Sequence, residues 1–287
     1  MKTTKRILSF TLSLCLCLAL NAAGADTFTD AHGNVIELDP SLEAYASVTL
    51  QGADRAARKG ETNLGDLWTD ALRWFASSGA INEYFEEDDV AAGNTQVAVD
   101  ADHIVALWNG GNLRADIPEG KFGAEQLAEV LPYPNKVAVV YMSGEALLEA
   151  LEAASQALPF TEETASACAA FMQVSGLKYT VDTAKEYDRG EACGEHWFRA
   201  ASLGRVVIGE VNGQPFEPDG LYAVITSNAN FNGMDSSYAF KAAAEANEKS
   251  TITTAVVRDV LWLYIAGELN GVIGDAYAAP QGRITVK

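Results

Sequence analysis

The clearest periodic pattern begins near residue 62, where apolar residues recur every three or four positions. This spacing is typical of a helix with one buried face, so the pattern predicts a helix that packs against a core. The polar sequence Thr62-Asn63 precedes the stripe. The stripe consists of Leu64, Leu67, Trp68, Ala71, Leu72 and Phe75.

Short apolar runs and further helical patterns follow without strict alternation. The predicted strands cover residues 104–108, 137–142, 171–181, 205–211, 221–226 and 283–286. The further predicted helices cover residues 123–130, 143–158 and 254–269. Such a mixture, without repeats or a visible linker, predicts a single α+β domain with a mixed sheet and packed helices.

The strand at 104–108 leads into the sequence Asn-Gly-Gly-Asn-Leu-Arg at 109–114. Glycine permits positive φ and lets a ligand approach the backbone closely. Asn109 offers donors and acceptors, and Arg114 offers a planar fork of donors for an anion or a ring. Because Asn-Gly-Gly is also a common turn sequence, the residues alone leave an ordinary turn as the alternative.

The N-terminal region predicts an exported protein. Residues 1–25 combine a basic start, an apolar run and a small-residue cleavage site, as a secretory signal peptide does. Residues 26–54 form an N-terminal extension with a predicted hairpin, in which Phe28 and Val35 flank the turn at 30–34. The domain proper is expected at 55–287. We expect a periplasmic or extracellular protein without a membrane anchor.

Charge narrows the possible partners. The chain has 39 acidic against 20 basic residues and a formal net charge of −19. This balance argues against nucleic-acid binding driven by the net field, although it leaves room for a local basic pocket.

Two cysteines, Cys168 and Cys193, lie beyond the predicted signal peptide. An even pair in an oxidising compartment predicts a disulfide, with two buried thiols as the alternative.

Seven short motifs, in order, resemble the C-terminal, substrate-binding domain of the 5′-nucleotidase family. The resemblance runs from about residue 55 to the end of the chain. The motifs lie at 61–67, 109–120, 130–135, 171–177, 212–219, 232–235 and 282–284.

The resemblance implies that a nucleotide or nucleoside is held between aromatic rings, with polar groups on its base, ribose and phosphate. Asp235 would bind the ribose hydroxyls and Arg58 the phosphate side. The implied substrate-binding residues are Arg58, Asn109, Arg114, Tyr133, Asn135, Phe231 and Asp235.

Two positions depart from the family pattern. Ala229 stands where the second stacking ring is expected, with Phe231 two residues later, and Asn112 replaces a glycine of the turn. The structural alternatives are a core ring for Tyr133, a turn cap for Asp235 and a solvated side chain for Arg58.

Family members hydrolyse their substrates in a separate metallophosphoesterase domain. The hydrolysis resembles two-metal chemistry, and a site of that kind needs several His and Asp ligands to hold the two ions. Here His32, His103 and His196 lie in no metal-ligand motif. We therefore expect no catalytic residues, metal ligands or cofactor in this chain. Its predicted function is nucleotide binding, in company with a separate metallophosphoesterase chain; a non-binding interaction scaffold and an autonomous phosphohydrolase are the alternatives.

Overall fold

A five-stranded mixed sheet lies at the centre of the protein. The computed structural model describes residues 26–29, 35–38 and 43–287. The strand order is β14-β6-β13-β4-β7, in which β13 and β4 run parallel and the other neighbours antiparallel. The strands are β4 (Ile104–Asn109), β6 (Lys136–Ser143), β7 (Met172–Ser175), β13 (Leu221–Ser227) and β14 (Thr251–Val256).

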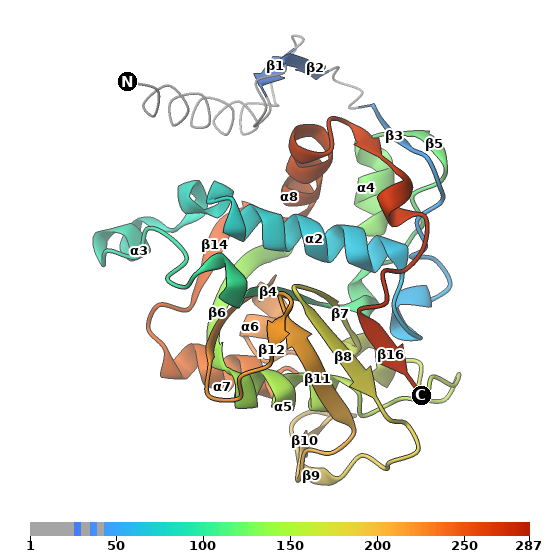
Figure 1. Ribbon diagram of the computed structural model, residues 1–287, viewed down its shortest axis with the longest axis vertical. Helices are drawn as coiled ribbons and strands as arrows, with labels where there is room; N and C mark the ends of the chain where they lie inside the picture. Colours follow the sequence, from blue (N-terminus) through green and yellow to red (C-terminus); the bar gives the residue numbers. More distant parts are fainter. Residues whose placement is uncertain (1–25, 30–34, 39–42) are drawn as a thin grey trace.

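Helices cover both faces of this sheet (Figure 1). On β4, Trp108 faces one core cluster, together with α2 and α8, whereas Leu107 faces a second cluster with α5 and α7. Burial on both faces explains why the central strands are continuous apolar runs. The helices are α2 (Asn63–Ser77), α3 (Glu87–Ala91), α4 (Ala124–Val130), α5 (Gly144–Ala154), α6 (Asn228–Phe231), α7 (Tyr238–Ala246) and α8 (Val257–Leu263). The predicted α+β fold with a mixed sheet and packed helices is therefore confirmed.

Helix α2 confirms the first prediction from the sequence. It begins after Thr62, whose side chain accepts a hydrogen bond from the Gly65 amide at 3.0 Å. This cap satisfies one of the amides that a helix start leaves without a partner. All six residues of the predicted apolar stripe are buried.

A second sheet has the order β12-β11-β8-β16. The single strand predicted at 171–181 is divided into β7 and β8, because Gly176 takes a φ of +81° and turns the chain from one sheet into the other. The strands of this sheet are β8 (Leu177–Val181), β11 (Val206–Val211), β12 (Gln214–Pro215) and β16 (Ile284–Val286).

One prediction near the C-terminus needs correction, and one helix was not predicted. The helix expected from residue 254 begins only at Val257, because the preceding residues form β14 and pair with β6. It then continues as a π-helix over Tyr264–Glu268. Helix α7, which the sequence analysis did not identify, packs against α5 and β6.

Smaller sheets complete the molecule. The predicted N-terminal hairpin is confirmed by the antiparallel pairing of β1 (Asp26–Thr29) with β2 (Val35–Leu38). The predicted signal peptide and the turn at 30–34 lie outside the described residues. In the part that is described, no helix has the length and apolar character needed to cross a bilayer. The remaining strands are β3 (Ala44–Ala46), β5 (Gly120–Phe122), β9 (Arg189–Ala192), β10 (Phe198–Ala200) and β15 (Val272–Ile273).

Buried charges fasten the C-terminal strand to α2. Glu61 accepts the backbone amides of Arg283 and Ile284 at 2.9 and 3.0 Å. The Arg283 guanidinium donates to Asp70 at 2.7 Å, and its Nε lies 3.6 Å from Asp66. These contacts explain why the motifs at 61–67 and 282–284 occur together, because residues of one motif bind residues of the other.

Asp66, one of the residues in these contacts, makes the stability of the protein depend on pH. Burial, with Glu61 beside it, raises the pKa of Asp66 from 3.8 to about 7, although Arg283 opposes the shift. Between these two values the folded protein holds a proton that the unfolded chain has lost. The contribution of Asp66 is therefore full below about pH 4 and is lost as the pH rises through about 7. We expect urea unfolding of Asp66→Asn to show a weaker decline of stability from pH 5 to pH 8 than the parent; equal declines would contradict this assignment.

Candidate functional site

Protein backbone fills the space beside the glycine turn. Strand β4 ends at Asn109, and the 3₁₀ turn η4 (Gly110–Asn112) follows. A Cβ on Gly110 would collide with the Ala57 carbonyl, and a Cβ on Gly111 would lie 2.6 Å from the Cβ of Ala169. The two glycines therefore admit the turns η1 (Ala56–Arg58) and η5 (Ala167–Ala170), not a ligand, and the expectation of close ligand approach at these two positions is corrected.

The segment at 52–62, which carries η1, is fixed by two side chains. Asp116 accepts the amides of Gly52 and Ala53 at 2.7 and 2.8 Å. Gln173, fully buried, donates to the carbonyls of Ala57 and Gly60 at 2.9 and 2.8 Å. The Gln173 Oε1 also accepts a hydrogen bond from the backbone amide of Thr62, the capping residue of α2, at 3.1 Å. Buried polar groups satisfied in this way specify one backbone position.

Arg58 is thereby held inside the protein. Only 8% of the residue is exposed, and its Nη1 donates to the Ala165 carbonyl at 2.8 Å. Burial lowers the pKa of Arg58, and the positive charges of Arg114 and Arg55 lower it further, whereas Cys168 and Asp235 raise it. Arg58 is therefore not a solvated side chain. Arg55, Arg58 and Arg114 are here called the arginine cluster, because the charges of Arg55 and Arg114 both act on Arg58.

Arg114 is paired with Tyr133. Its Nη2 donates to the Tyr133 hydroxyl at 3.0 Å, and its guanidinium carbon lies 5.5 Å from the ring centroid. Tyr133 is 45% exposed, so it is not a core ring. An exposed ring beside a guanidinium offers a flat surface for stacking.

Asn112 supports Asn109. The Asn112 amide donates to the Asn109 Oδ1 at 3.0 Å, and Asn109 is 6% exposed. The departure from the expected glycine thus supplies a hydrogen bond that orients the first residue of the motif.

Asp235 lies in the loop after α6 with a φ of +57°. Burial raises the pKa of this carboxyl, and the charge of Arg58 opposes the shift. Across the described part of the chain, the carboxylate has neither a hydrogen-bond nor an ion-pair partner. The cap position of α7 belongs to Ser237, so Asp235 is not a turn cap. Its acceptors are available to a ligand.

Two predicted residues stand apart from this arrangement. Phe231 packs against the second core cluster and, among the described rings, stacks on none. Asn135 is half-buried, and its backbone carbonyl accepts from the Val257 amide at 3.0 Å. The charges of Arg114 and Asp235 thus act on Arg58, and Arg114 is in direct contact with Tyr133. Asn109 precedes Gly110, whose backbone packs against Ala57 of η1. Within the described ranges, neither Phe231 nor Asn135 interacts with these residues.

The predicted disulfide is wrong. Both Cys168 and Cys193 carry free thiols. Cys168 is a buried residue of η5, and its sulfur lies 3.3 Å from the Ala157 carbonyl oxygen and 3.7 Å from Thr164 Oγ1. Cys193 follows β9 and donates its amide to Trp197 at 2.9 Å. An even cysteine count gives no information on whether the two side chains meet.

Sequence reasoning missed the residues that position the site. Gln173 and Asp116 lie inside the motifs at 171–177 and 109–120, yet neither was assigned a role. The sequence did offer a hint, since a Gln in a predicted buried strand and an Asp after the glycine turn are polar residues within the motifs. The backbone groups that they bind lie more than 60 positions away, so the sequence alone could not identify these partners.

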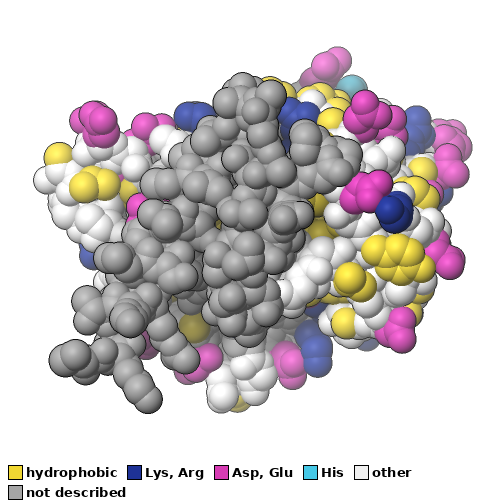
Figure 2. All heavy atoms as spheres, turned by 90° about the horizontal axis from the view of Figure 1, so that it is seen from above, with side chains coloured by type: hydrophobic (Ala, Val, Ile, Leu, Met, Phe, Trp, Pro, Cys, Tyr) yellow, Lys and Arg dark blue, Asp and Glu magenta, His cyan; other side chains and the backbone are white. Residues whose placement is uncertain are grey.

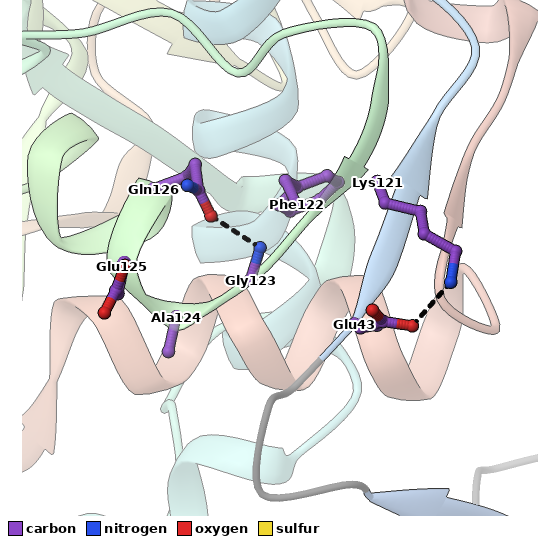
Figure 3. A pocket seen from close by; sticks show the side chains of 7 residues that line it. All are labelled: Glu43, Lys121, Phe122, Gly123, Ala124, Glu125 and Gln126. Carbon is purple, nitrogen blue, oxygen red and sulfur yellow. Dashed lines mark hydrogen bonds and ion pairs between the residues drawn. The ribbon is translucent and has the colours of Figure 1, made fainter.

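Two further cavities lie elsewhere. One, of about 410 Å³, opens at the start of α4 (Figure 3). There Gln126 accepts the Gly123 amide at 2.8 Å, and Lys121 pairs with Glu43 at 2.7 Å, so these groups already satisfy one another. The other, of about 230 Å³, lies between α2 and the β11–β12 turn. Neither is lined by a predicted site residue.

Known proteins support the resemblance. Trifunctional nucleotide phosphoesterase protein YfkN of Bacillus subtilis is 32% identical over 136 residues, which are 47% of this chain and 8% of YfkN. The 5′-nucleotidase precursor of Thermus thermophilus is 28% identical with a TM-score of 0.59, over 85% of this chain and 39% of that one. The NAD nucleotidase of Haemophilus influenzae shares the fold, at 16% identity and a TM-score of 0.56, over 85% and 38% of the two chains. This chain thus spans well under half of each relative.

A sequence model for the family described as 5′-nucleotidase, C-terminal domain, matches residues 41–245. This segment covers most of the chain and contains every residue predicted to bind substrate. The chain belongs to the 5′-nucleotidase C-terminal domain family.

Proposed function

We propose that this protein binds a nucleotide or nucleoside beside the arginine cluster. The observation that carries the proposal is that the charges of Arg114 and Asp235 both act on the buried Arg58, while the Asp235 carboxylate has no protein partner among the described residues. The protein is acidic overall, and carboxylates recur on the visible part of the face in Figure 2. Within this acidic protein the charges of Arg58 and Arg114 still repel each other locally, and a bound anion would offset that repulsion.

Each group has a role that suits its chemistry. Arg58 and Arg114 provide guanidinium donors for a phosphate, and Asp235 can accept from two adjacent ribose hydroxyls. Tyr133 offers an exposed face to the base, and Asn109 a polar contact held by Asn112. Asn135 and Phe231 remain proposed contacts to the ligand.

We assign binding, not hydrolysis, to this chain, since the match is to the part of the family described as the C-terminal domain. Hydrolysis would come from a separate metallophosphoesterase chain, which this protein would supply with substrate. We further propose that residues 1–25 direct export to the periplasm or the extracellular space, and that residues 55–287 form the binding domain.

Isothermal titration of the purified chain with AMP, adenosine and a UDP-sugar tests the proposal. We expect saturable binding of at least one ligand, and a ten- to hundredfold weaker affinity for Asp235→Ala, since a hydrogen bond to a charged group is worth about 1.5–3 kcal/mol. Asp219→Ala, in an exposed loop, is the matched control and should bind as the parent does. A folded protein that binds none of the three ligands would overturn the proposal.

A second candidate is an interaction scaffold whose pocket binds no nucleotide. The observation in its favour is that Ala229 occupies the place of a stacking ring while Phe231 is packed against the core. The absence of heat with every ligand would select this function. Metal-dependent phosphate release by the isolated chain would instead show an autonomous phosphohydrolase.

A further inference from the structure

The cavity of about 230 Å³ is walled by four separate segments. They are α2, the glycine turn between β7 and β8, the turn between β11 and β12, and the residue before β16. In Figure 1 the β11–β12 hairpin rises toward α2 at this place. This volume is large enough for a phosphate or a short carboxylate.

Most charges in the cavity wall are already compensated. Arg283 donates to Asp70 at 2.7 Å, and Ser175 donates to the same carboxylate at 2.6 Å. Lys178 pairs with Glu210 at 2.9 Å across β8 and β11. These contacts leave one cation of the wall without an ion pair.

That cation is Arg73 of α2. Its Nε donates to the Ile104 carbonyl at 3.2 Å, and across the described ranges its two terminal nitrogens have no protein partner. Burial lowers the pKa of Arg73; Asp70 and Asp102 raise it without approaching to ion-pair distance. A half-buried guanidinium without a counter-ion is costly, and a bound anion would relieve that cost.

The backbone makes room for this guanidinium. Gly176 has a φ of +81°, and a Cβ there would lie 2.9 Å from the Nε of Arg73 and 3.0 Å from the Oδ1 of Asn212. Asn212 is itself fixed, since its amide donates to the carbonyls of Asp102 and Ile104 at 2.8 and 3.1 Å. The absence of a Cβ at Gly176 thus leaves room for the Arg73 side chain, which lines the cavity.

This cavity is separate from the proposed nucleotide site. Arg73 of the cavity wall donates to Ile104 at the start of β4, whereas Arg58 of the arginine cluster lies in η1, which packs against the turn beyond the other end of the strand, at Asn109. Five residue steps along a strand correspond to roughly 17 Å.

We propose that the Arg73 cavity binds a small oxyanion, a carboxylate or a phosphate, through the two free nitrogens of the guanidinium. Such bidentate pairing is the geometry that guanidinium groups favour. Asn212, which is fixed by its own hydrogen bonds, limits the size of the ligand. The site goes beyond the proposed nucleotide function and does not depend on it.

The test is calorimetric titration of the full chain with inorganic phosphate and, separately, with malonate, in the parent, Arg73→Gln and Arg58→Gln. We expect the parent to bind at least one of the anions, with affinity reduced at least tenfold by Arg73→Gln and a component retained in Arg58→Gln. If phosphate alone binds, the ligand is a phosphate; if malonate binds, it is a carboxylate. Unchanged binding in Arg73→Gln, or a signal lost only in Arg58→Gln, would overturn the proposal.

A second measurement guards against misfolding of Arg73→Gln. In the parent protein, the arginine Nε–Hε signals of an NMR spectrum report each guanidinium separately. Assignment of the Arg73 signal by Arg73→Lys, which keeps the charge and the aliphatic stem, allows the shift to be followed during titration. An Arg73 signal that does not move at saturating anion would refute the site, even if another part of the protein binds.

Discussion

Replacing Glu152 with alanine is expected to lower the free energy of unfolding by about 3 kcal/mol or more, because it leaves buried donors without partners. Glu152 lies on α5 with 1% exposure, and its carboxylate accepts the backbone amides of Gly204, Arg205 and Val206 at 2.9–3.2 Å. Glu152 therefore holds residues 204–206, where β11 begins, against α5. The charge of Glu152 also supports Arg205, which is 3% exposed.

Urea unfolding followed by circular dichroism measures this effect. Glu145→Ala is the matched control, since it removes an exposed carboxylate from the same helix and should cost no more than about 1 kcal/mol. Glu152→Gln keeps one acceptor and should fall between the two. A Glu152→Ala protein as stable as the control would show that water replaces the carboxylate at this position.

Local patterns in the sequence were sufficient where one element determines its own structure. The stripe from Leu64 to Phe75 has helical spacing and a capping residue before it, and α2 forms there. The run at 104–108 is apolar throughout because both faces of β4 are covered. In these cases the residues carry the information themselves.

Prediction failed where distant segments decide. Residues 254–256 were included at the start of a helix, yet pairing with β6 draws this segment into β14. Short apolar runs fit a strand or a helix equally well, and only tertiary partners choose between them. The strand expected at 171–181 was divided for a related reason, because Gly176 allows the chain to change sheets.

The candidate site was predicted in part. The resemblance named Arg58, Arg114 and Asp235, and in the structure the charges of Arg114 and Asp235 act on Arg58. The groups that position them were not found, since Gln173 acts on residues more than 110 positions away. The prediction of a disulfide failed for the same reason, because the number of cysteines says nothing about the distance between Cys168 and Cys193 in the fold.

Gly110→Ala is the substitution expected to damage the nucleotide site most. The new Cβ would meet the carbonyl group of Ala57, which is backbone and cannot rotate away. The turn η1 must then move, and with it Arg58 and the hydrogen bond from Gln173 to Ala57. We expect a loss of about 3 kcal/mol in stability, at the upper end of the usual range for overpacking, and at least a tenfold loss in nucleotide affinity.

Gly60→Ala separates this effect from a general intolerance of larger residues. Gly60 belongs to the same segment and also receives a hydrogen bond from Gln173, but a Cβ there has no atom within 4 Å. The control should therefore keep both stability and binding, as measured by urea unfolding and by titration with the ligand that the parent binds. If Gly110→Ala binds as tightly as Gly60→Ala, the arginine cluster does not depend on the packing of η1 against the glycine turn. Weak binding by Gly110→Ala alone would show instead that the two adjacent glycines serve the ligand indirectly, by allowing the turn that carries Arg58 to lie against β4.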